Sequence, residues 1–506
     1  MKIVLNGNGI KSIKELLEER GVSLYAPCAG HGTCGQCVVT VVSGECPPSE
    51  KDKKFLSPED LARGLRLACR AFPVGEITVM TKDAASPVIC EDYLSVSGAV
   101  TTTQRDGLFC GIDLGTTTIV LAALGADGRP TATRSFLNPL VRYGADVVSR
   151  LEAAANGKLN EMKDLLREKI EEELSDFADV LNKGKTVFTA LAGNTVMTHI
   201  FMGWDTSGLG TYPFKPYSLS YAESNLCGAP VFVFPGISAF VGGDIVAGIY
   251  GLDLADGTDG DMLMDLGTNG EMVLKTENGL IASSASAGPA LEGAHLSCGT
   301  GCVEGAVTGV TLENLRPVLT VAGRDSSNNK RLEGACGSAI LELTDELLRT
   351  GILSPDGTFS SGYADEGFAF GTDRDGRVLA LTQSDVRELQ LAKSAVSTTA
   401  LMLCDKGNVL PDSLNIRLAG GMGSGLRPER IRRTGIIPTG ASVKAVGNSA
   451  LGGLMRFLGE CRDSDSKENA VKTLSELAGS VTVYDLALDR DFEEKFMASM
   501  SFIPSR

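Results

Sequence analysis

Apolar and polar positions alternate over short runs at the start of the chain, which predicts a small domain of mixed strands and helix. Ser12 stands before the one amphipathic stretch, and Glu15 follows three residues later, the spacing of a helix capping box. The strands are expected where β-branched residues cluster. The predicted strands are residues 2–6, 38–42 and 76–81, and the predicted helix is residues 12–20.

From residue 107 the pattern changes to longer apolar strands that end in polar turns. Residues 108–113 run into Leu-Gly-Thr-Thr-Thr, and residues 262–265 run into Leu-Gly-Thr-Asn-Gly. A second apolar run follows each turn, so each reads as a hairpin. The repeated Asp-Leu-Gly-Thr device predicts two related α/β lobes that face one another. The expected parts are a first domain at 1–83, a linker at 84–106, a first lobe with a middle domain at 107–257, and a second lobe with the C-terminal region at 258–506.

Four cysteines in the first domain have the spacing of an iron–sulfur loop. Cys28, Cys34 and Cys37 follow a C-x5-C-x2-C pattern in a Gly-rich segment, and Cys69 comes 32 positions after Cys37. Glycines permit backbone conformations that side chains forbid, so three thiolates can wrap one small cluster. The spacing indicates a [2Fe–2S] cluster with these four ligands.

The aspartates of the two repeated turns are candidates for phosphate and metal chemistry. Glycine after an apolar strand lets backbone N–H groups approach an anion, and threonine hydroxyls add donors. An aspartate at such a turn can hold Mg²⁺ through its water shell. Two such turns would grip a nucleoside triphosphate from opposite sides. The residues expected to do so are Asp113, Gly115, Thr116, Thr117, Thr118, Asp265, Gly267, Thr268 and Asn269.

Two other segments extend this hypothesis. An apolar strand from residue 415 enters a turn in which Gly420, Gly421 and Gly423 offer a flat backbone surface for a nucleoside. Asp244, in Val-Gly-Gly-Asp before a predicted helix, is a candidate to orient the attacking water or the metal. The alternative is that Asp244 only caps that helix. The chain has no G-x-x-x-x-G-K-[ST] motif, so a Walker-type site is excluded.

Composition excludes several classes of function. The net charge of −16 disfavours a nucleic-acid partner, because phosphate backbones require a basic face. No apolar stretch approaches the roughly 20 residues of a membrane helix, and residues 1–7 do not read as a signal peptide. We therefore expect a cytoplasmic protein without a membrane partner. Cys298 and Cys302 form the other close cysteine pair, and the lack of further ligands nearby favours packing over a second metal site.

The two Asp-Leu-Gly-Thr turns and the Leu-Ala-Gly-Gly-x-Gly turn resemble the actin, sugar-kinase and Hsp70 nucleotide-binding superfamily. Together with the N-terminal cysteine loop, further segments resemble the reductive activators of corrinoid proteins more closely, over nearly the whole chain. These segments are residues 138–139, 143–146, 192–195, 213–216, 240–245, 265–271, 287–290, 336–338 and 496–500.

This resemblance implies a multidomain α/β and α+β protein. A β-grasp [2Fe–2S] ferredoxin domain would precede a two-lobed, RNase H-like ATPase domain. The family implies an ATP-dependent reductase of anaerobic metabolism that returns Co(II) corrinoid to Co(I) for methyl transfer. The implied cofactors are a [2Fe–2S] cluster, ATP and Mg²⁺. The implied partners are the corrinoid protein of a methyltransferase system, an upstream low-potential electron donor and a second copy of the chain in a homodimer.

Two alternative functions stay open from the sequence. One is an ATP-driven electron activator of another low-potential enzyme, similar to those of 2-hydroxyacyl-CoA dehydratases, which typically bridge a [4Fe–4S] cluster across a dimer. The other is a redox-sensing nucleotide-binding protein without turnover. The N-terminal cysteine loop disfavours the first, and phosphate release with Mg²⁺ would separate the second. A plain sugar kinase does not account for the cluster.

Overall fold

The chain folds as two compact units: residues 1–86 with 137–169, and residues 87–136 with 170–506. The computed structural model describes residues 1–22, 24, 28, 30–32, 35, 37–81, 107–125, 130–267, 269–293, 296–323, 332–374, 376–420, 426–461 and 463–503. Some predicted features lie outside the described residues: the linker at 84–106, Cys34, Thr268, Gly421 and Gly423. The predicted division of the chain at residues 83, 106 and 257 stays a prediction.

A four-stranded sheet with the order β1-β4-β2-β3 forms the start of the first unit. The predicted capping box is confirmed, because the Ser12 hydroxyl accepts from the Glu15 N–H and Glu15 bonds back to Ser12. Leu5, Ile13 and Leu17 are buried between sheet and helix. The elements are β1 (Lys2–Asn8), α1 (Ile13–Glu18), β2 (Val38–Ser43), α2 (Glu50–Phe55), α3 (Pro58–Ala62), β3 (Leu65–Leu67) and β4 (Val74–Met80).

Residues 137–169 complete the first unit with short helices. Asn138 caps the first of them by accepting from the Leu140 N–H, and Asp146 caps the next by accepting from the Ser149 N–H. The elements are η1 (Pro139–Tyr143), α4 (Val147–Ala153), η2 (Ala154–Lys158) and the start of α5 (Leu159–Val180).

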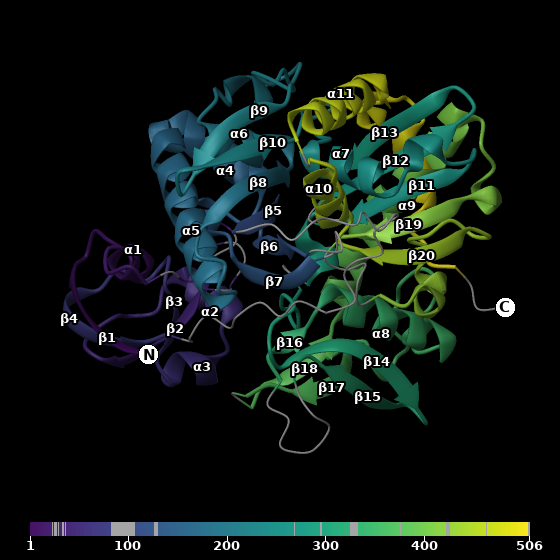
Figure 1. Ribbon diagram of the computed structural model, residues 1–506. Helices are drawn as coiled ribbons and strands as arrows, with labels where there is room; N and C mark the ends of the chain where they lie inside the picture. Colours follow the sequence, from purple (N-terminus) through teal and green to yellow (C-terminus); the bar gives the residue numbers. More distant parts are fainter. Residues whose placement is uncertain are drawn as a thin grey trace. The chain divides into compact units, whose positions relative to one another are not determined.

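Two six-stranded sheets form the frame of the second unit (Figure 1). The first has the order β7-β6-β5-β8-β10-β9, and the second has the order β20-β19-β11-β12-β13-β21. The first contains β5 (Leu108–Leu114), β6 (Thr118–Leu124), β7 (Pro130–Leu137), β8 (Thr186–Gly193), β9 (Ala222–Leu226) and β10 (Ala229–Val233). The second contains β11 (Asp261–Leu266), β12 (Gly270–Thr276), β13 (Gly279–Ala285), β19 (Asn415–Ala419), β20 (Ser442–Gly447) and β21 (Thr482–Val483).

The two sheets repeat one design, as the internal repeat of the sequence predicts. In the first, β5 pairs antiparallel with β6, and β8 and β10 then add in parallel on the other side. In the second, β11 pairs antiparallel with β12, and β19 and β20 add in parallel. Each predicted turn therefore joins the first two strands of its own sheet, so equivalent residues of the two lobes occupy equivalent places.

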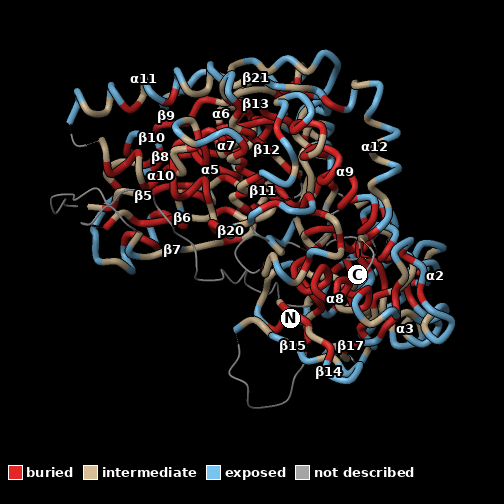
Figure 2. Tube along the Cα trace, turned by 90° about the vertical axis from the view of Figure 1, so that its right-hand side faces the viewer, coloured by how far each residue is buried: buried red, intermediate tan, exposed pale blue. Residues whose placement is uncertain are grey.

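Helices α7 (Gly243–Gly251) and α10 (Ser449–Glu460) pack closely against each other. A Cβ on Gly453 would come within 1.9 Å of the Ala247 carbonyl oxygen, so glycine is required at this crossing. Helix α10 follows β20 of the second sheet but packs on β5 and β8 of the first. The pair therefore ties the two sheets together, and both helices are buried in Figure 2.

The other helices cover the sheets or extend the second lobe. The long α9 lies against β12 and β13, and α8 lies against β14 of a small three-stranded sheet, order β15-β14-β16. No helix in the described part of the chain is long and apolar enough to cross a membrane. The remaining elements are α6 (Thr195–Met202), η3 (Ser207–Leu209), η4 (Leu254–Asp256), η5 (Pro289–Glu292), β14 (Ala306–Glu313), β15 (Arg316–Val321), β16 (Gly334–Ala335), α8 (Gly337–Arg349), β17 (Phe368–Thr372), β18 (Val378–Leu381), α9 (Gln383–Gly407), η6 (Pro411–Ser413), η7 (Pro428–Arg430), η8 (Arg432–Thr434), α11 (Ser464–Ser480), η9 (Leu486–Leu488) and α12 (Phe492–Ala498).

Candidate functional site

Two consecutive side chains at the start of α10 reach the aspartates of both turns. The Asn448 Nδ2 donates to Oδ2 of Asp113 over 2.6 Å, and the Ser449 Oγ donates to Oδ2 of Asp265 over 3.4 Å. Asp113 is the next-to-last residue of β5, and Asp265 is the next-to-last residue of β11. The two predicted turns thus meet at the amino end of one helix.

Asn194 plays a similar part beside the first turn. Its side chain donates to the Thr116 Oγ1 over 2.9 Å, and its Oδ1 accepts from the Met197 N–H over 3.0 Å and so caps α6. Asn448 also caps its own helix, because its Oδ1 accepts from the Leu451 N–H over 2.8 Å. Both asparagines come after a strand that ends in glycine, so the same strand–Gly–Asn–helix device occurs once in each lobe.

The aspartates of the two turns titrate well above the ordinary range of carboxylates. Burial raises the pKa of Asp113 to about 6, and the bond from Asn448 opposes that rise. Burial also raises the pKa of Asp265 to about 7, and the neighbouring Asp113 adds to the shift. Surrounding protein penalises the charged form, and like charges add to that penalty.

Asp244 belongs to the same group of carboxylates. Burial raises its pKa to about 7, with further contributions from Asp265 and Asp113. Gly242 is the N-cap of α7, and Asp244 lies in the first turn, where its Oδ1 accepts from the Ile245 N–H over 2.8 Å. The alternative interpretation of Asp244 as the helix cap is therefore wrong.

Glu271 joins the group although sequence reasoning assigned it no role. It stands directly across from Asp265 in the antiparallel pairing of β11 and β12. Burial raises its pKa, and Asp244 and Asp265 raise it further, while a bond from the Asn269 side chain opposes the rise. Directly opposed residues of an antiparallel pair have close Cβ atoms, so the alternation of strand residues could have indicated Glu271.

Glycine is required at two places close to the aspartates, one inside the first turn and one against Asp265. A Cβ on Gly115 would lie 2.3 Å from the Thr118 carbonyl oxygen, which no side chain could tolerate. Gly420 has a φ of +96°, and its Cβ would lie 2.6 Å from Oδ1 of Asp265. The start of the predicted nucleoside turn therefore packs directly against the second aspartate.

The other residues that are predicted to bind phosphate also lie in the two turns. The Gly267 N–H donates to the Asn269 carbonyl oxygen over 2.9 Å, which closes the second turn. Thr118 begins β6, and Thr117 lies in the first turn. The roles of these residues stay predictions.

The set of donors at these turns fits a hard cation. Asp113, Asp244, Asp265 and Glu271 are all partly accessible and supply only oxygen ligands. Among the described residues, no three His, Cys, Asp or Glu side chains converge as a direct metal cage. Mg²⁺ does not need one, because it usually keeps several waters and uses one or two carboxylates together with substrate phosphates.

The cysteine site of the first unit is described for three of its four predicted ligands. Cys28, Cys37 and Cys69 are buried, and the Sγ atoms of Cys37 and Cys69 are 3.3 Å apart. The Cys37 thiol bonds to Cys69 and lowers the pKa of the Cys69 thiol, although burial opposes this. Gly32 has a φ of +67°, and its Cβ would lie 2.6 Å from Nε of Arg70, so the loop depends on glycine there. Buried cysteine sulfurs this close together fit a thiolate-ligated cluster.

Comparison with known proteins gives matches along most of the chain. Residues 4–74 match the 2Fe-2S iron-sulfur cluster binding domain, residues 108–257 match the RACo middle region, and residues 259–506 match the C-terminal domain of RACo, the ASKHA domain.

Two curated relatives and one solved structure are similar to the chain. The corrinoid activation enzyme RamQ of Eubacterium limosum is 29% identical over 77% of this chain and 69% of its own. The [Co(II) methylated amine-specific corrinoid protein] reductase of Methanosarcina barkeri is 27% identical over 47% of this chain and 46% of its own. The solved structure of a reductive activator for corrinoid, iron-sulfur protein has 22% identity and a TM-score of 0.68, covers 98% of this chain and 96% of its own, and supports the fold.

Proposed function

Because the chain belongs to the RACo family, we propose that it is an ATP-hydrolysing iron–sulfur activase that reduces a corrinoid protein. It would pass one electron from a [2Fe–2S] cluster to Co(II) and so regenerate Co(I) for methyl transfer. The observation that carries this proposal is the start of α10, where Asn448 and Ser449 bond to the aspartates of both lobes. A nucleotide bound between these turns can therefore change how the two lobes are placed relative to each other.

The electron carrier would be held by Cys28, Cys34, Cys37 and Cys69. When bound, a [2Fe–2S] cluster supplies one-electron transfer at low potential. The chain's contribution is to bury the ligands, to bring the Cys37 and Cys69 sulfurs together, and to bend the loop at glycine. The matched cluster-binding domain at residues 4–74 supports this assignment.

ATP with Mg²⁺ would lie at the paired turns. We assign the phosphates to the backbone and hydroxyl groups of residues 115–118 and 267–269, and the nucleoside to the turn that begins at Gly420. Asp113 and Asp265 would hold the hydrated metal ion, which restores their ionised forms at neutral pH. Asp244 would orient the attacking water, and Glu271 would help to neutralise the metal ion.

Nucleotide is needed because the electron transfer runs uphill. A plant-type [2Fe–2S] centre lies at about −400 mV, and we take the cobalt couple to lie lower. A two-state clamp driven from 1:99 to 99:1 requires about 5.5 kcal/mol. At about 2.3 kcal/mol per 100 mV, this energy corresponds to roughly 240 mV for one electron. Closure of the lobes on ATP is thus of the right scale to bias the transfer.

The proposal includes partners that follow from the family alone. These are a corrinoid protein of a methyltransferase system, a low-potential electron donor, and a second copy of the chain in a homodimer. We also expect the protein to act in the cytoplasm.

The test is coupling of ATP turnover to cobalt reduction. Anaerobically reconstituted, reduced protein is mixed with a Co(II) corrinoid protein, and Co(I) absorbance and phosphate release are followed together. We expect Co(I) only with hydrolysable ATP and Mg²⁺, and phosphate release several-fold faster with the corrinoid protein present. A non-hydrolysable ATP analogue is the control. A rate of phosphate release that the corrinoid protein does not change, with no Co(I) formed, would contradict the proposal.

A further inference from the structure

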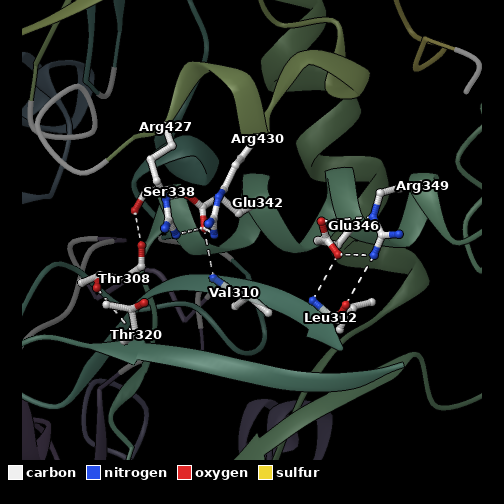
Figure 3. Close-up of polar contacts among 10 residues, drawn as sticks. All are labelled: Thr308, Val310, Leu312, Thr320, Ser338, Glu342, Glu346, Arg349, Arg427 and Arg430. Atoms are coloured by element: carbon white, nitrogen blue, oxygen red, sulfur yellow. Dashed lines mark hydrogen bonds and ion pairs between the residues drawn. The ribbon is translucent and has the colours of Figure 1, made fainter. Parts of the chain in front are cut away.

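One face of α8 completes the edge of strand β14. The Ser338 hydroxyl donates to the Thr308 carbonyl oxygen over 3.0 Å, Glu342 Oε2 accepts from the Val310 N–H over 3.1 Å, and Glu346 Oε2 accepts from the Leu312 N–H over 3.1 Å. Helix side chains that are four residues apart thus contact every second residue of the strand. The two spacings match because four residues of a helix and two residues of a strand advance by similar lengths. Figure 3 shows these contacts in a row.

Glu342 has a second bond that sets it apart in this row. Its carboxylate has no exposed surface and takes a two-pronged bond from Arg427, with Nε to Oε1 at 2.7 Å and a terminal nitrogen to Oε2 at 2.6 Å. Arg430 approaches the same carboxylate at 3.8 Å. Figure 3 shows the side chains of Arg427 and Arg430 reaching from above to the Glu342 carboxylate. A buried carboxylate needs such a partner, and the forked bond fixes the direction of Arg427.

The neighbouring strand is shaped to admit this pair. A Cβ on Gly309 would lie 2.6 Å from a terminal nitrogen of Arg427 and 3.0 Å from Oε2 of Glu342. The pairing of β14 with β15 also shifts register between Val307 and Gly309. Any larger residue at this position would push the guanidinium group away from the carboxylate.

Arg427 stands close in the chain to the predicted nucleoside turn. On one side of that turn, Gly420 packs against Asp265. On the other side, Leu426 is buried and Arg427 is bound to α8. Further along, Asp345 of α8 accepts from both the backbone N–H and the side chain of Arg433, each over 2.7 Å. Helix α8 therefore holds the chain that follows β19 at two points.

We propose that Glu342 is a positioning residue of the nucleotide site, which it serves by holding Arg427 and so the chain that follows the Gly420 turn. The inference rests on the proposed function, because it supposes that ATP binds at this turn. A segment held in place before the ligand arrives loses less entropy on binding. Loss of the Glu342 bond therefore weakens nucleotide binding without removing any group that reacts.

Glu346 offers a matched control on the same helix. It makes the same kind of bond to β14 and pairs with an arginine, but that arginine, Arg349, belongs to α8 itself. Glu346→Gln thus disturbs the strand edge and an ion pair and weakens an attraction to Arg430, but it leaves the bonds that α8 makes to Arg427 and Arg433 in place. Glu342→Gln disturbs the equivalent strand bond and also releases Arg427.

The experiment measures binding of a Mg²⁺-bound, non-hydrolysable ATP analogue to the full chain by calorimetry, together with KM and kcat for ATP and the melting temperature without nucleotide. For E342Q we expect Kd and KM to rise about tenfold while kcat stays within about twofold. For E346Q we expect Kd within about twofold of the unsubstituted protein.

A second variant covers the case in which E342Q does not fold. Arg427→Lys keeps a cation beside Glu342 but removes the fork, and we expect its Kd to rise at least about threefold. Folded E342Q or R427K that binds as tightly as the unsubstituted protein, or equal losses in E342Q and E346Q, would overturn the inference alone. An unsubstituted protein that binds no nucleotide would overturn the proposed function as well.

Discussion

The first and second Asp-Leu-Gly-Thr turns have nearly the same sequence and equivalent places in their sheets, yet their surroundings differ. Asp113 accepts a short bond of 2.6 Å from an uncharged amide, Asn448, which favours its ionised form. Among the described residues, Asp265 accepts a long bond of 3.4 Å from Ser449, and it stands across from another acid, Glu271. The protein therefore partly stabilises the charge of the first aspartate, whereas the second aspartate depends more on a cation that is bound with the ligand.

Loss of the second aspartate should have the largest effect on turnover. Asp265→Asn removes the aspartate whose described bond to α10 is the longer of the two, so we expect kcat for ATP hydrolysis to fall about 100-fold or more, as for other groups that stabilise charge in a transition state. Asp113→Asn should cost only about tenfold. Phosphate release at saturating Mg²⁺ and ATP checks this, with circular dichroism as the control for folding. Equal losses in the two variants would remove the proposed difference between the turns.

A change of the amide beside the first turn should have an intermediate effect. Asn448→Asp keeps a good N-cap for α10 but replaces a donor to Asp113 with a like charge. We expect the Kd for Mg²⁺–ATP analogue to rise about tenfold in calorimetry, since 1.4 kcal/mol corresponds to that factor. Unchanged binding would show that the bond from Asn448 does not set the properties of Asp113.

The pH dependence of stability should also distinguish the aspartates of the two turns. Unfolded aspartates have a pKa of about 3.9, whereas burial raises the pKa of Asp113 to about 6 and that of Asp265 to about 7. At a pH between the unfolded and the folded pKa, the unfolded chain has lost protons that the folded chain still keeps. The free energy of unfolding should therefore fall as the pH rises from the unfolded to the folded pKa. The slope is at most about 1.4 kcal/mol per pH unit for each such proton.

Urea unfolding with a chelator present measures this slope. Asp265→Asn should flatten the decline up to about pH 7, and Asp113→Asn only up to about pH 6. Excess Mg²⁺ should remove most of the decline, because the cation favours the ionised carboxylates. A decline of the same range in both variants would contradict the difference in pKa.

Loss of the hydroxyl beside the second turn should have the smallest effect. Ser449→Ala removes a bond of 3.4 Å, which is long for a hydroxyl donor, so we expect less than about a twofold change in Kd for nucleotide. The same calorimetry as for Asn448→Asp provides the measurement. A change as large as that of Asn448→Asp would mean that α10 serves both turns alike.

Several parts of the fold and of the site were predictable because their signals are local in the chain. The capping box of Ser12, the apolar strands that end at Asp113 and Asp265, and the repeat of the two lobes all depend on residues near one another in sequence. The spacing of the four cysteines likewise indicated a [2Fe–2S] domain, and residues 4–74 match one. Short-range patterns of this kind reflect the helix and strand periods directly.

Other parts of the site were decided only by tertiary structure. Asn448 meets Asp113 across 335 positions of the chain, and Glu342 meets Arg427 across 85, distances over which no periodic pattern operates. The position of Glu271 across from Asp265 follows from a local hairpin, but its proximity to Asp244 of α7 came from packing. The sequence by itself determined which turns and ligands the chain carries. Packing of α10 on the first sheet and of α8 on β14 decided which groups are their partners, because most buried polar groups bond to whichever partner the fold brings near.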